Sequence, residues 1–145
     1  MAFRFPLASV LRVRESIEQR EERALQRIQM EMARVSHQIE ELTAVIAGVH
    51  DAQEEALRHP IPAGYLHTLL WQKQVATERR KVLLSSLQAL EQMREKQIKI
   101  YQLAHRNHET LISMKNEQRN AYELQQARTQ QKSLDDLFIA RRHRI

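Results

Sequence analysis

The sequence contains no cysteine, only two glycines and three prolines, and few aromatic residues. The absence of cysteine excludes disulfide bonds and thiolate metal sites. The scarcity of glycine and proline argues against β-sandwiches and barrels, which need a turn about every ten residues. Aromatic residues make up 5% of the 145 residues and charged residues 28%, so a compact core would lack bulky side chains. We therefore expect an elongated, all-α protein.

The few helix breakers gather in one short stretch, which reads His59-Pro60-Ile61-Pro62-Ala63-Gly64. Two prolines one residue apart stop a helix firmly, because each lacks a donor and restricts the residue before it. Within a single domain of residues 1–145, the sequence predicts a helix over about 7–57, a turn over 58–65, a helix over about 66–140 and a basic tail over 141–145.

Apolar residues in the first helical segment recur in alternating steps of three and four, the spacing of a coiled-coil seam. They are Leu25, Ile28, Met32, Val35, Ile39, Leu42, Ile46 and Val49. Nearer the amino terminus Arg14, Glu18 and Glu21 occupy the seam positions. We expect the helix pairing to loosen there.

The second segment carries a weaker seam on the same lattice. Its apolar members are Leu69, Ala76, Leu83, Leu87, Leu90, Tyr101, Ala104, Leu111 and Tyr122, interrupted by Lys73, Arg80, Arg94 and Lys115. Two such stripes can bury each other across a short turn, so we predict a long two-helix antiparallel coiled-coil hairpin. The second helix is the longer, and from near Asn116 it should project past the amino-terminal end and fray in part. A parallel homodimer is the alternative, but it would place the prolines inside a continuous rod.

The residues indicate no catalytic, cofactor or metal site, because two paired helices offer no natural concavity. Two glycines sixteen positions apart cannot form a phosphate-binding loop. His105 and His108 lie one helical turn apart, but their order does not match the zinc-protease motif and no third ligand is near in sequence. We expect His108 to pack at a polar seam position and His105 to be solvated. The chain is thus predicted to be no enzyme and to bind no small-molecule substrate.

Basic residues outnumber acidic ones by 23 to 18, and the excess lies entirely in residues 61–145. An antiparallel hairpin would bring basic residues from both termini to one end: Arg4, Arg12, Arg14, Arg119, Arg128, Arg141 and Arg142. This end favours an acidic partner. Discontinuous basic clusters with few aromatic residues between them argue against a dedicated nucleic-acid reader.

Apolar residues are in excess directly after the turn, where Tyr65, Leu66, Leu69, Leu70 and Trp71 exceed what one seam can hide. Trp71 either locks the turn against the first helix or belongs to an exposed docking patch for a second partner. No run approaches the roughly 20 apolar residues that a membrane span needs. The acid-free residues 1–14 leave an organelle transit peptide as a further alternative.

Both ends of the chain resemble the FliJ family of flagellar type III export proteins. The resemblance rests on the opening residues 3–15, FRFPLASVLRVRE, and on the closing residues 131–137, QKSLDDL. The central turn in a charged, helical chain agrees with it. The sequence departs from the family pattern at Asp136, where glutamate is common, and in the two prolines of the turn.

This resemblance implies a cytoplasmic, non-enzymatic stalk, located peripherally at the inner membrane. Its partners would be the flagellar export ATPase hexamer, the cytoplasmic domain of the export gate, and export chaperones. We predict that the ATPase binds the basic end and the export gate the apolar tip. The virulence secretion counterparts have a similar architecture. A generic coiled-coil scaffold and a basic nucleic-acid-associated protein are the alternatives outside the family.

Overall fold

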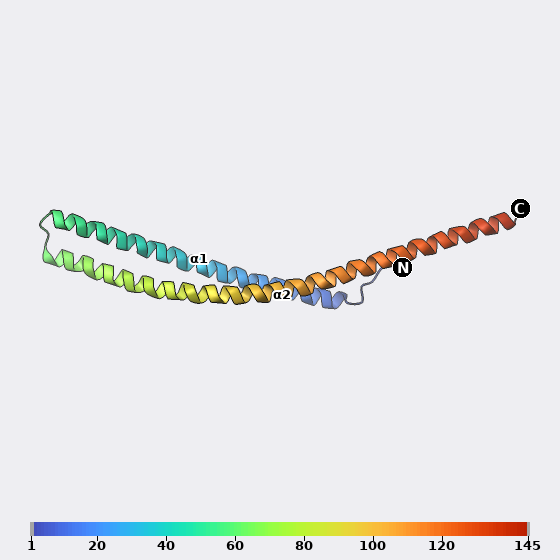
Figure 1. The fold of residues 1–145 in the computed structure, drawn as a ribbon, viewed down its shortest axis with the longest axis horizontal. Helices are drawn as coiled ribbons and strands as arrows, with labels where there is room; N and C mark the ends of the chain where they lie inside the picture. Colours follow the sequence, from blue (N-terminus) through green and yellow to red (C-terminus); the bar gives the residue numbers. More distant parts are fainter. Residues whose placement is uncertain (1, 145) are drawn as a thin grey trace. The chain divides into compact units, whose positions relative to one another are not determined.

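A computed structural model describes residues 2–144. It contains two α-helices and, within these residues, no strand: α1 (Ala8–Arg58) has 51 residues and α2 (Ala63–His143) has 81 (Figure 1). The predicted fold class, an all-α two-helix hairpin, is confirmed. Each helix differs by a few residues from its predicted bounds.

The start of α2 lies three residues earlier than predicted. The amide groups of Tyr65 and Leu66 both donate to the carbonyl oxygen of Pro62, at 3.1 Å and 3.4 Å. Pro62 thus occupies the N-cap position, where its missing N–H costs no intrahelical hydrogen bond. Gly64, expected in the turn, lies in the first turn of α2 without a positive φ. The loop between the helices shortens to residues 59–62.

The carboxyl end of α2 also extends further than predicted. Arg141, Arg142 and His143 belong to its last turn and not to a separate basic tail. Positive side chains are favourable there, because the carboxyl end of a helix carries a partial negative charge. After Asn116, α2 continues as one helix to His143; Ile145 lies outside the described residues.

Packing divides the chain into two units, which we describe separately. The tip unit comprises Glu22–Ile100. The terminal unit comprises the described residues up to Glu21 together with those from Tyr101 onward.

In the tip unit, α1 and α2 lie side by side in opposite directions, joined by the short loop (Figure 1). The most buried side chains are Val35, Val49, Leu69 and Ala76. The remaining predicted apolar seam residues of this unit are half-buried: Leu25, Ile28, Met32, Ile39, Leu42, Ile46, Leu83, Leu87 and Leu90. The seam predicted from the spacing of three and four is therefore the core of this unit.

In the terminal unit, the first turns of α1 pack on the middle of α2. Arg14, Glu18 and Glu21 are half-buried here, so the pairing continues through the charged seam positions where we expected it to loosen. The amino-terminal residues before α1 extend this contact, since Phe5 is buried and the ring of Phe3 lies 5.6 Å from that of Tyr122.

Candidate functional site

The predicted tip residues differ in how far they are exposed. Leu69 is only 6% exposed and belongs to the seam, whereas Trp71 is 63% exposed. The reason is helical geometry, because two residues correspond to about 200° around a helix and turn Trp71 away from α1. Tyr65, Leu66 and Leu70 are exposed as well. Four of the five predicted tip residues are thus exposed, and Leu69 has a packing role.

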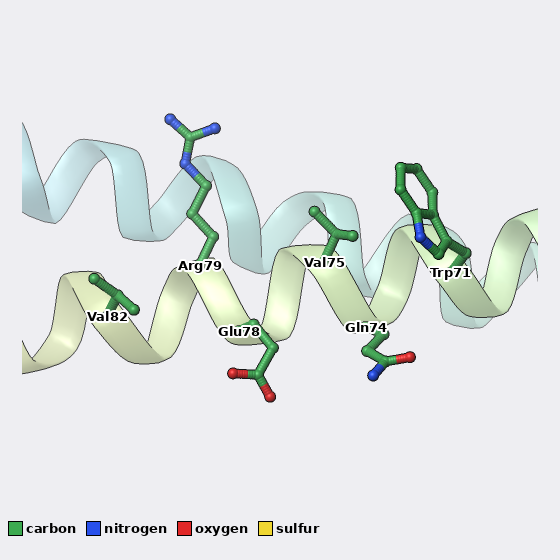
Figure 2. Close-up of a pocket in the computed structure, with 6 residues that line it drawn as sticks. All are labelled: Trp71, Gln74, Val75, Glu78, Arg79 and Val82. Atoms are coloured by element: carbon green, nitrogen blue, oxygen red, sulfur yellow. The ribbon is translucent and has the colours of Figure 1, made fainter.

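Two valines continue the exposed apolar face of Trp71 along α2. Trp71, Val75 and Val82 are all exposed and line one shallow depression together with Gln74, Glu78 and Arg79. Figure 2 shows Trp71, Val75 and Arg79 projecting to one side of α2, with Gln74 and Glu78 projecting to the other. A single helix provides all six residues, so the depression is open. Our sequence analysis missed both valines, although their spacing from Trp71 places them on its face of the helix.

Replacing Trp71 with alanine should barely change stability. The side chain is mostly exposed, so we expect Trp71→Ala to lower the free energy of unfolding by less than about 1 kcal/mol. The matched change Leu69→Ala, two residues away in the seam, should cost about 2 to 3 kcal/mol. Urea unfolding followed by circular dichroism measures both. Equal losses would mean that Trp71 locks the turn.

All seven arginines of the predicted basic end lie in the terminal unit. Arg14 is half-buried at the seam, and Arg4, Arg12, Arg119, Arg128, Arg141 and Arg142 are exposed. No carboxylate within residues 2–144 forms an ion pair with any of them. These positive charges are not gathered at one point. Tyr122 is the residue of α2 that contacts Phe3 near the amino terminus, and the 19 residues from Tyr122 to Arg141 correspond to roughly 28 Å of helix.

The end of α2 forms a second surface, which we name the carboxyl-terminal segment, residues 123–143. Every residue in it is exposed, including Leu134, Leu137 and Phe138. These three side chains line a shallow depression with Asp135 and Arg141. Our candidate residues included only the arginines of this segment. The spacing of Leu134, Phe138 and Arg141 by one turn each could have revealed its apolar and basic face.

Glu18 of α1 forms a polar contact with two histidines of α2 in the terminal unit. Its side chain is 15% exposed. His105 Nδ1 donates to Glu18 Oε1 at 2.8 Å, and His108 Nδ1 donates to Glu18 Oε2. The ring of His105 also stacks on Tyr101, with 6.0 Å between centroids. His108 packs at a polar seam position as predicted, but His105 binds Glu18 and is not merely solvated.

The paired groups shift one another's protonation. Burial by itself would raise the pKa of Glu18, but the hydrogen bonds from His105 and His108 outweigh it and lower the pKa. The bond to Glu18 in turn raises the pKa of His105, helped by the charges of Glu18 and Glu109. Our sequence analysis missed Glu18, because only the fold brings residues 87 positions apart into contact.

Neither a metal-binding cluster nor a membrane-spanning helix is found within residues 2–144. Among residues 2–144 no group of three or more histidine, aspartate or glutamate side chains is arranged to hold a metal ion. No helix within this range has an apolar stretch long enough to cross a membrane. The depressions at Trp71 and Phe138 are open and lie on single helices. The surfaces suit contact with other macromolecules.

Comparison with known proteins supplies the context for these surfaces. The family model described as "Flagellar FliJ protein" matches residues 3–144. The chain belongs to the FliJ family. This membership makes it a coiled-coil protein related to flagellar export, and the match covers both units of the structure. Searches of curated proteins and of solved structures found no match.

Proposed function

We propose that the protein is a non-enzymatic stalk of the flagellar type III export apparatus. Its terminal unit binds the export ATPase hexamer and promotes its activity. Its tip unit contacts the cytoplasmic domain of the export gate, and the stalk also serves export chaperones. It would work in the cytoplasm, peripherally at the inner membrane.

The carboxyl-terminal segment is the observation that carries this proposal. These last turns of α2 expose both apolar side chains and arginines along their whole length. A partner with an apolar groove and surrounding carboxylates would cover both kinds of side chain. Family membership makes the export ATPase the natural candidate.

The separation of the two candidate surfaces supports two different partners. The seven arginines lie in the terminal unit, and the exposed tip residues Tyr65, Leu66, Leu70 and Trp71 lie in the tip unit. A basic surface gains affinity from many modest, salt-screened ion pairs, while an apolar surface gains it from a few desolvated anchors. Substitutions should therefore disrupt one interaction without the other.

Charge reversal tests the ATPase contact. The double variant Arg12→Glu with Arg142→Glu should bind the export ATPase about tenfold more weakly at low salt, and the loss should shrink at high salt. The matched control, Arg27→Glu with Arg94→Glu, makes the same charge change on exposed residues of the tip unit. Binding by pull-down and ATPase turnover are the measurements. Equal weakening by both double variants would show a nonspecific effect of net charge.

The variant Trp71→Ala tests the other contact. It should weaken binding to the export gate domain and leave stimulation of the ATPase unchanged. If adding the parent protein leaves the turnover of the export ATPase unchanged and no complex is detected, a generic scaffold is favoured instead. Salt-dependent binding to arbitrary DNA would favour the nucleic-acid alternative.

A further inference from the structure

We propose that Glu18, His105 and His108 form a proton-controlled clasp that holds the first turns of α1 against α2 at mildly acidic pH and loosens as the pH rises. The clasp lies entirely within the terminal unit. It concerns the conformation of the chain itself and stands apart from the export partners.

The geometry shows why the contact depends on protons. A carboxylate can only accept hydrogen bonds, so both Nδ1 atoms must carry a proton when they bind Glu18. If both rings are neutral, the cluster keeps one half-buried negative charge. A single further proton on an imidazole Nε2 cancels that charge, which favours the paired conformation. The proton belongs to the coupled cluster more than to either ring.

Because the cluster is partly shielded from water, its net charge affects how stable the contact between α1 and α2 is. The side chains of Glu18 and His108 are 15% and 17% exposed, and that of His105 is 47% exposed. The other histidine–glutamate pairs in the described residues are different: His37 with Glu41, His50 with Glu54, and His59 with Glu55 each join neighbouring turns of the chain and are exposed on both sides. Only the Glu18 cluster links α1 to α2 among these pairs.

Charged side chains take part of the seam in this stretch of α1, beside the half-buried apolar residues Leu11 and Ile17. Its half-buried seam residues include Arg14 and Glu21 beside Glu18, so apolar burial is reduced. Arg14 and Glu21 of α1 and Lys115 of α2 are half-buried charged residues of the same unit, and the charge of Glu109 of α2 acts on His105. Arg20 Nη2 lies 3.1 Å from Glu21 Oε1 and partly neutralises that carboxylate. Loss of the clasp should therefore free the local pairing before the rest of the chain unfolds.

The pH range follows from the direction of each shift. The raised pKa of His105 adds stability below its ordinary value of 6.5, and this is lost as the pH rises through the higher folded value. The lowered pKa of Glu18 adds stability above its ordinary value of 4.5, and this is lost as the pH falls through the lower folded value. The clasp should be tightest between these two ordinary values.

Hydrogen exchange of the full chain can test the clasp. After correction for intrinsic exchange, amides of residues 8–21 should lose roughly three- to tenfold in protection between about pH 5.5 and pH 8. Glu18→Gln keeps the shape and an acceptor oxygen but removes the charge, so it should flatten this pH dependence. His50→Gln, which disrupts an exposed pair in the tip unit, is the matched control and should retain it.

Proton resonances of the histidine rings give a second measurement, which does not depend on how much of α1 opens. The ring of His105 should titrate at a higher pH in the parent protein than in Glu18→Gln, because the variant removes the charge that raises the pKa of His105. The clasp is wrong if protection of residues 8–21 does not change with pH in the parent. It is equally wrong if His50→Gln flattens the profile as much as Glu18→Gln does.

Discussion

Replacing Val35 with aspartate should unfold the tip unit at a much lower urea concentration than the parent requires. Val35 is 4% exposed at the centre of the seam, so the variant buries an unpaired carboxylate between two helices. We expect a loss of about 3 kcal/mol in the free energy of unfolding. Circular dichroism at increasing urea measures it.

A matched control separates burial from helix propensity. Val45 lies on the same helix but is 49% exposed, so Val45→Asp makes the same chemical change outside the seam. It should cost less than about 1 kcal/mol, because a solvated carboxylate on a helix surface needs no partner. Similar losses in the two variants would contradict the seam as the source of stability in the tip unit.

Ending the chain at Tyr122 should greatly reduce stimulation of the export ATPase while leaving the paired helices as stable as before. The removed segment includes Leu134, Phe138 and Arg141 and makes no packing contact that buries any of its described residues. Its loss should reduce the helical signal without moving the urea midpoint. If this segment supplies the main anchors, stimulation should fall by at least about tenfold.

Full-length Trp71→Ala is the comparison for this truncation. It alters the tip unit and should stimulate the ATPase as the parent does. A truncated chain that still stimulates fully would remove the carboxyl-terminal segment from the proposed interface. A lower urea midpoint for the truncated chain would show that the segment packs on the rest of the protein.

The sequence allowed the helical pairing to be predicted because the seam is a local, periodic property. From Leu25 to Val49, apolar residues recur in steps of three and four without interruption. Each of these predicted seam positions is buried or half-buried in the structure. The breakers at Pro60 and Pro62 located the turn for the same reason. α2 starts earlier than predicted, because a proline is typical both of a turn and of the beginning of a helix.

The sequence by itself determined the helical class, the seam and the position of the turn, since each depends on spacing along one chain. Only the tertiary structure decided which side chains lie against the other helix. It buried Leu69 while leaving Trp71 exposed, and it brought Glu18 to His105 and His108. These outcomes depend on the rotation of each helix about its axis and on the register between helices. Contacts between residues far apart in sequence decide both.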